Sequence, residues 1–106
     1  MTFPNPAEAN TVSREVVDKR LAACANVMTP MHSFYWWNEQ VQSESEIAVV
    51  FKTTEARVDA LIAFVAEAHS YEVPAIVVHR PLQAARSYEE WVERETTAGG
   101  AGRGKA

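Results

Sequence analysis

The order of hydrophobic periodicities constrains this chain more than any other feature of its sequence. Two segments, 6–23 and 54–69, carry apolar residues at the three- and four-residue spacing of a helix. Runs rich in β-branched or aromatic residues precede, separate and follow them at 1–3, 24–37, 47–52 and 74–78. The order β–α–β–β–α–β predicts an α+β, ferredoxin-like sandwich, in which an antiparallel sheet carries both helices on one face.

Capping residues set the expected boundaries of the helices. Asn5 is expected to cap the first helix, which should end near Ala23, and Thr54 is expected to open the second. A short terminal helix is predicted at 87–95, where Ser87 and Glu90 match a capping box.

Glycine is confined to the last eight residues of the chain. We therefore predict a single domain over 1–97 and a disordered, glycine-rich tail over 98–106. The polar stretch 38–46 is expected to form a hairpin tip, with Asn38 as its left-handed turn residue. The sheet face without helices is expected to meet another subunit.

Composition excludes several classes of protein. A net charge of −4 argues against nucleic-acid binding, which depends on basic residues. The longest apolar run, 60–66, is too short to span a membrane, and the N-terminus does not resemble a signal peptide, so a cytoplasmic location is predicted. No nucleophile motif or glycine-rich phosphate loop occurs in 1–98, so the protein is not expected to be an enzyme.

Five motifs carry a family resemblance, and they occur in the order RLAACANV (20–27), FYWW (34–37), FKTT (51–54), HSYEVPAIV (69–77) and SYEEWV (87–92). Together they closely resemble the CutA family of divalent-cation tolerance proteins, over residues 2–95. The resemblance implies a PII-like homotrimer, joined through the hairpin and the C-terminal part of the chain. It also implies a non-catalytic role in tolerance of copper or other divalent cations.

The chain departs from the family pattern at three places. The family's first strand usually begins several residues ahead of the position of Thr2, so we expect that strand to start before Met1. The usual tip, Trp-Glu-Gly-Lys, is replaced by residues 37–40, which contain no glycine. In the motif His-Pro-Tyr-Glu-Val-Pro-Glu, Ser70 replaces the first proline and Ala75 the last glutamate.

Candidate metal ligands are His69, Glu72 and Cys24, because imidazole binds copper and related divalent ions, thiolate selects copper(I) or zinc, and carboxylate is a weaker addition. Each has a purely structural alternative. His69 is also placed to meet the carbonyl groups that end the second helix. Cys24, between apolar residues, is also typical of a small buried core residue.

Candidate residues of a ligand-binding cleft are Tyr35, Trp37, Lys52, Thr53, Tyr71 and Arg20. The aromatic residues of 35–37 are equally typical of a subunit interface. Lys52 and Thr53 precede a helix and suit a small anion, whereas simple capping also explains the threonines. Two hypotheses follow: a homotrimer that binds a divalent metal ion, or a PII-like sensor of a small anion or trimeric scaffold.

Overall fold

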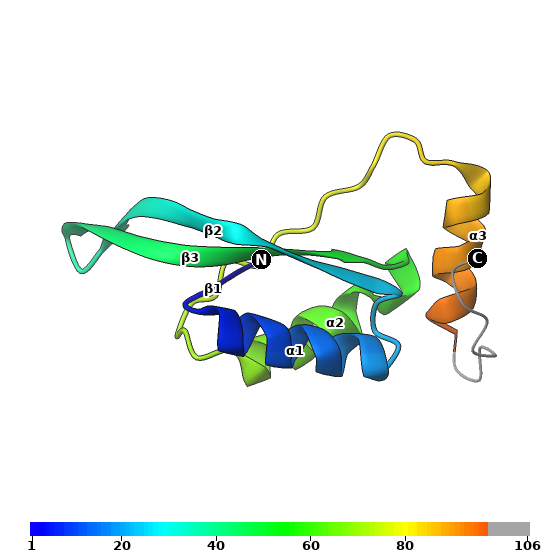
Figure 1. The fold of residues 1–106 in the computed structure, drawn as a ribbon, viewed down its shortest axis with the longest axis horizontal. Helices are drawn as coiled ribbons and strands as arrows, with labels where there is room; N and C mark the ends of the chain where they lie inside the picture. The colour runs from blue at the N-terminus through cyan, green and yellow to red at the C-terminus, as the bar shows by residue number, and fades with distance from the viewer. Residues whose placement is uncertain (98–106) are drawn as a thin grey trace.

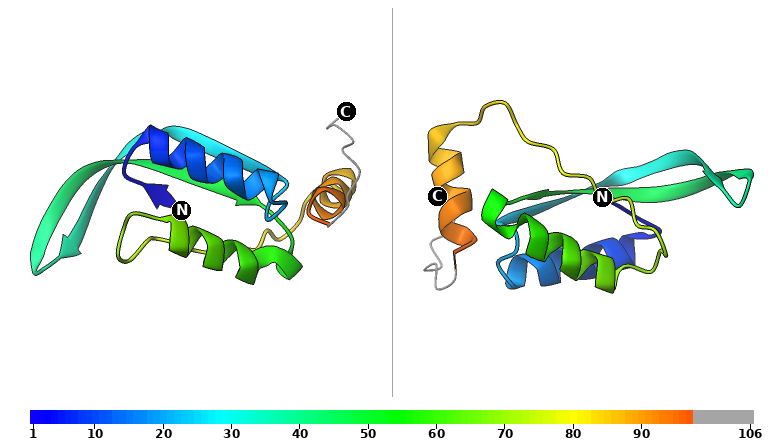
Figure 2. Two further views of the ribbon diagram at one scale, coloured as in Figure 1. Left: turned by 90° about the horizontal axis from the view of Figure 1, so that it is seen from below. Right: turned by 180° about the vertical axis from the view of Figure 1, so that it is seen from behind.

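In the computed structural model, which describes residues 1–97, six elements follow the order β1 (Thr2–Phe3), α1 (Pro6–Asp18), β2 (Cys24–Trp37), β3 (Gln40–Lys52), α2 (Glu55–Ala68) and α3 (Arg86–Glu95). Strand β3 is the centre of the sheet and pairs antiparallel with both β1 and β2. Helices α1 and α2 lie side by side on the same face of this sheet (Figures 1 and 2). The predicted α+β plan is confirmed.

The core lies between the sheet and these two helices. Phe3, Val16, Val49 and Val65 are its largest fully buried side chains, and they come from β1, α1, β3 and α2 respectively. Burying one such side chain contributes roughly 1.5–3 kcal/mol. The apolar residues that recur at helical and strand spacing in the sequence therefore pack against one another in a single core.

Helix α1 begins as predicted and ends earlier than predicted. The Asn5 side chain accepts a hydrogen bond from the Glu8 N–H at 2.8 Å, which confirms the N-cap. The prediction that the helix reaches Ala23 is wrong, because Arg20 takes a left-handed conformation with φ 58°. The N–H groups of Arg20 and Leu21 then donate to carbonyls of the last helical turn at 3.0 and 3.1 Å.

The β2–β3 hairpin is longer and its turn tighter than predicted. Strand pairing continues to Trp37 and Gln40, so only Asn38 and Glu39 form the turn. Both have positive φ, 50° and 63°, as in the tight turns that match strand twist. The left-handed Asn38 is confirmed, whereas the nine-residue tip is wrong because residues 40–46 belong to β3. The hairpin projects beyond the two helices (Figure 1).

Segment 74–78 was expected to form the fourth strand, and this prediction is wrong. These residues lie in no strand of the sheet. In the ferredoxin-like order their neighbour would be β1, which contributes only Thr2 and Phe3 to strand pairing. With so short a neighbour, the segment has no matching row of backbone groups to pair with.

Helix α3 follows the long segment that leaves α2 and stands at the far end of the sheet from the hairpin tip (Figure 1). It starts at Arg86, with Ala85 as a cap that makes no side-chain hydrogen bond. The predicted capping box at Ser87 and Glu90 is therefore wrong. The predicted tail, 98–106, lies outside the described residues.

Candidate functional site

A cleft of about 760 Å³ lies between the β2–β3 hairpin and segment 70–75. Three carboxylates line it, from Glu44, Glu46 and Glu72. Among the described residues that form its wall, none is a lysine, arginine or histidine. The cleft therefore carries a concentration of negative charge without a basic side chain to balance it.

Strand register explains why the hairpin carboxylates line the same cleft. Tyr35 lies opposite Gln42, and Ser33 lies opposite Glu44. Because side chains alternate along a strand, Gln42, Glu44 and Glu46 point to the same face as these β2 residues. Segment 70–75 then brings Tyr71 and Glu72 to the same cleft.

The Tyr71 hydroxyl donates a hydrogen bond to Glu46 Oε2 at 3.0 Å. Glu46 is only 7% exposed, so this bond satisfies a carboxylate that has lost most of its water. Burial, followed by the hydrogen bond to Glu46, raises the pKa of Tyr71 well above its usual value. Burial and the nearby carboxylates of Glu44 and Glu46 also raise the pKa of Tyr35. Both phenols therefore keep their protons to a higher pH than a free tyrosine does.

The three predicted metal ligands do not form one group within residues 1–97. Glu72 lines the cleft. His69 is buried at the end of α2, where its Nε2 lies 2.7 Å from the Thr2 carbonyl oxygen. Cys24 begins β2 at the opposite end of the hairpin ladder, and its thiol contacts Asn26 Oδ1 at 3.7 Å. Within residues 1–97, no three histidine, cysteine, aspartate or glutamate side chains are grouped so that they could hold one metal ion.

The predicted cleft residues divide into two groups. Tyr35, Trp37 and Tyr71 line the acidic cleft. Lys52 and Thr53 lie at the other end of β3, where the Lys52 ammonium contacts Asn26 and the Thr53 hydroxyl donates to the Leu21 carbonyl at 2.6 Å. Arg20 donates to the Glu95 carbonyl at 3.1 Å and thereby holds the end of α3.

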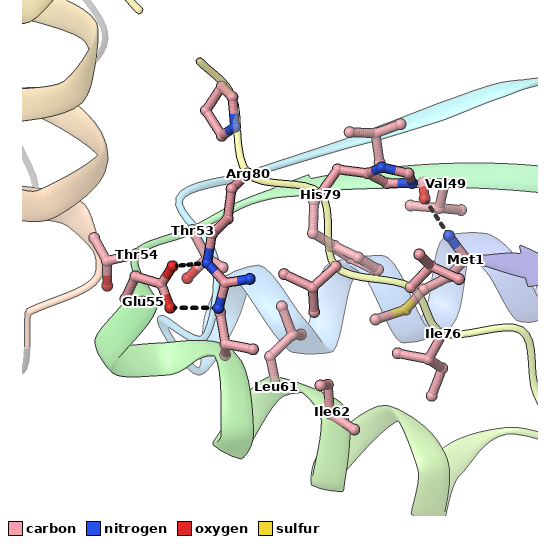
Figure 3. Close-up of a pocket in the computed structure, with 16 residues that line it drawn as sticks. Met1, Val49, Thr53, Thr54, Glu55, Leu61, Ile62, Ile76, His79 and Arg80 are labelled. Atoms are coloured by element: carbon pink, nitrogen blue, oxygen red, sulfur yellow. Dashed lines mark hydrogen bonds and ion pairs between the residues drawn. The ribbon is translucent and has the colours of Figure 1, made fainter. Parts of the chain in front are cut away.

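A second cavity, of about 420 Å³, is bounded by β3, α2 and segment 76–81 (Figure 3). Its wall is mainly apolar, and the Met1 ammonium at its edge donates to the Val49 carbonyl at 3.0 Å. Burial lowers the pKa of this ammonium. An Arg80–Glu55 ion pair lies near the start of α2. The described wall of this cavity thus contains one carboxylate, Glu55, where the cleft has three.

The sequence SESE (43–46), with Glu39, reads as a solvated hairpin edge whose carboxylates could hold hard cations weakly, and it does not by itself assign Glu44 and Glu46 to a cleft. The signal that could have placed them is their spacing. Two carboxylates two residues apart point to the same face of a strand, but they point in different directions in the irregular tip that was expected. Extending the strand from 47 back to 40 would have identified both residues.

The sheet order, the two helices on one face and the hairpin that projects beyond them define a PII-like α+β fold. A CutA structure from Thermus thermophilus, described as a divalent cation tolerance protein, superposes with a TM-score of 0.87 at 32% identity, covering 91% of this chain and 93% of that one. A "PII-like protein CutA" from Nostoc sp. PCC 7120 gives 0.84 at 31% identity, covering 91% and 92%.

The sequence relatives agree with the structural neighbours. The family model for "CutA1 divalent ion tolerance protein" matches residues 1–95. The chain is 35% identical over 91 residues to the divalent-cation tolerance protein CutA of Thermotoga maritima, covering 86% of this chain and 89% of the relative. Protein CutA of Mus musculus is 36% identical over 96 residues, covering 91% of this chain. The chain spans about half the length of that mammalian relative. This chain belongs to the CutA1 divalent ion tolerance family.

Proposed function

We propose that this protein is a non-catalytic homotrimer that binds divalent cations in the acidic cleft between the β2–β3 hairpin and segment 70–75. One observation carries the proposal: Glu44, Glu46 and Glu72 line one cleft whose described wall contains no basic side chain. Such a cleft attracts cations and repels anions. The divalent-cation tolerance named for relatives in the family supports the same class of ligand.

The carboxylate oxygens of the cleft determine which metal ions should be tested. Carboxylates bind hard and borderline divalent ions, and Cu²⁺ binds more tightly than its neighbours at almost any nitrogen or oxygen site. We therefore propose that the protein's ligands come from among Glu44, Glu46 and Glu72, and we include Cu²⁺ with Zn²⁺ and Mn²⁺. A single chain does not group three ligating side chains within its described residues. Water or a second subunit would supply the remaining ligands.

Exposed apolar residues beside the cleft support assembly. Phe34, Trp36 and Val41 are 71%, 73% and 58% exposed, and all three belong to the hairpin that projects beyond the helices. A soluble domain rarely leaves such a patch open to water. Aromatic anchors of this kind are typical of subunit interfaces, and the likeness to a PII-like neighbour supports the proposed trimer.

The small-anion hypothesis has less support from the described contacts. Lys52 and Thr53 already make hydrogen bonds to Asn26 and Leu21. Glu55 places a carboxylate in the first turn of α2, where an anion would bind, and Arg80 pairs with it. The helix N-terminus therefore presents a carboxylate to any incoming anion.

Isothermal titration calorimetry of the purified protein tests the proposal. Zn²⁺, Cu²⁺ and Mn²⁺ would be titrated into the wild type and into Glu44→Gln and Glu46→Gln, with acetate and succinate as the anion panel. Glu15→Gln, an exposed carboxylate on α1, is the matched control. We expect at least one cation to bind, with an affinity that falls in both cleft variants and is unchanged in the control. Binding of a carboxylate without binding of any cation would overturn the proposal.

Two further parts of the proposal have their own measurements. Sedimentation equilibrium should give three times the chain mass, and a monomer at micromolar concentration would contradict the trimer. None of the helices within residues 1–97 has the length and apolar character needed to cross a membrane. We propose the cytoplasm as the compartment, and cell fractionation tests it, because a relative from Archaeoglobus fulgidus is described as periplasmic.

A further inference from the structure

His69, at the end of α2, joins two other elements through its ring. Its side chain has no exposed surface. Nε2 lies 2.7 Å from the Thr2 carbonyl oxygen in β1. The imidazole also stacks on Phe3, with ring centroids 4.6 Å apart and an interplanar angle of 18°. On the α1 side, Glu8 Oε2 lies 3.6 Å from Nδ1 and accepts a hydrogen bond from the Ser70 N–H at 3.1 Å.

The neighbours of the ring determine its tautomer. A carbonyl oxygen only accepts hydrogen bonds, so the Thr2 contact requires a hydrogen on Nε2. The Tyr71 backbone N–H only donates, and it reaches Nδ1 at 3.0 Å, so Nδ1 must present its lone pair. The ring is therefore a neutral imidazole with both nitrogens engaged. A metal ion at Nδ1 would first have to displace the Tyr71 N–H.

Tyr71 connects this buried ring to the cleft. Its N–H is held by His69 Nδ1, and its hydroxyl donates to Glu46 Oε2 at 3.0 Å. The Tyr71 and His69 rings also contact each other, with centroids 4.9 Å apart. The Tyr71 backbone is thus held by His69, and the Tyr71 hydroxyl is held by Glu46. Tyr71 therefore links the His69 ring to the Glu46 carboxylate through these two hydrogen bonds.

We propose that His69 is a positioning residue of the acidic cleft and not a ligand of the cation. Its unprotonated Nδ1 fixes the Tyr71 backbone, and Tyr71 in turn orients the Glu46 carboxylate towards the cleft. The inference rests on the proposed function, because it describes how a cation site in that cleft is held in shape. Such supporting contacts to a metal site typically change metal affinity by 10- to 100-fold when removed.

Two isosteric substitutions separate the two contacts of the ring. The amide oxygen of His69→Asn falls near the position of Nδ1 and can still accept from the Tyr71 N–H. The amide nitrogen of His69→Gln falls near Nε2 and keeps the donor to Thr2, but the acceptor for Tyr71 is lost. Both variants lose the imidazole, so a ligand role predicts equal loss of metal affinity in both.

Zn²⁺ titration calorimetry on the full-length wild type and both variants gives the first measurement. Hydrogen exchange of the Tyr71 amide, followed by NMR without metal, gives the second. We expect the amide to be protected in the wild type and His69→Asn and to exchange rapidly in His69→Gln. We expect Zn²⁺ affinity to be close to wild type in His69→Asn and at least roughly tenfold weaker in His69→Gln.

Three results would overturn the inference. Equal loss of Zn²⁺ affinity in both variants would assign His69 as a ligand. Wild-type affinity in His69→Gln, despite loss of Tyr71 amide protection, would show that the contact does not shape the site. The third is a shift of a His69 ring ¹⁵N resonance in the wild type when Zn²⁺ is added, of the size that metal coordination causes. This measurement does not depend on a variant that folds. An unchanged ring resonance at Zn²⁺ saturation would support the positioning role. A wild type that binds no divalent cation would instead contradict the proposed function itself.

Discussion

The Tyr71 hydroxyl and the Glu46 carboxylate meet at 3.0 Å and join segment 70–75 to the central strand of the sheet. Tyr71→Phe would leave the nearly buried carboxylate without this donor. A buried acceptor left without its hydrogen-bond donor costs about 1–3 kcal/mol, so we expect the free energy of unfolding in urea to fall by about that amount. Glu46→Gln can still accept the bond and should cost less.

A double-mutant cycle of these two changes isolates the pair. The combined variant should be less destabilised than the sum of the single variants, because the second change removes the carboxylate that the first leaves unpaired. Strictly additive effects would show that the bond does not form in solution.

The raised pKa of Tyr71 predicts how stability depends on pH. The folded protein keeps this proton at pH values where the unfolded chain, with a tyrosine pKa of about 10, has lost it. The stabilisation is therefore complete below pH 10 and is lost as pH rises above it. Urea unfolding between pH 9 and 11 should show this decline, and the decline should be shallower in Tyr71→Phe. Equal slopes for the two proteins would contradict the raised pKa.

The tight turn of the hairpin predicts a stabilising substitution. Glu39 has φ 63°, which costs a residue with a Cβ roughly 1 kcal/mol and costs glycine almost nothing. Glu39→Gly should therefore raise the free energy of unfolding by about 0.5–1 kcal/mol. Gln40→Gly, one residue on and already in β3, should lower it instead. A decrease for both would indicate that the turn is not formed as described.

Ala75 also lines the cleft, at the position where the family pattern has glutamate. Ala75→Glu should add a fourth carboxylate to Glu44, Glu46 and Glu72. One more unit charge near a divalent ion contributes roughly 1 kcal/mol even in water-like surroundings, which corresponds to about fivefold tighter binding. Calorimetry with Zn²⁺ measures the change, with Ala75→Gln as the uncharged control. Weaker binding in Ala75→Glu would place the cation elsewhere.

Much of the fold follows from local sequence patterns. Periodicity located both helices and the antiparallel hairpin, and the lack of glycine in this part of the chain pointed to Asn38 as a left-handed turn residue. Predictions from these patterns were wrong where an element depends on its neighbours in space. Segment 74–78 reads as a strand, but a strand exists only when a partner strand pairs with it, and β1 pairs through two residues. The predicted end of α1 was wrong for a related reason. The left-handed residue there is Arg20, whereas a glycine usually marks a helix end.

The site was less predictable than the fold. Tyr35, Trp37, Tyr71 and Glu72 were candidate residues from the sequence, and all four line the cleft, although their role there stays a prediction. Glu44 and Glu46 were not assigned to it, because a polar run looks the same in a loop and on one face of a strand. The two-residue spacing gains its meaning only from the register of β3 with β2.

The most direct test of the central claim is the position of a bound cation. Crystals of the protein grown with Zn²⁺, measured on both sides of the zinc absorption edge, would locate the ion by its anomalous signal. We predict a peak in the cleft, within bonding distance of carboxylate oxygens of Glu44, Glu46 or Glu72. A peak bonded to the His69 ring or the Cys24 sulfur, with none in the cleft, would contradict this account.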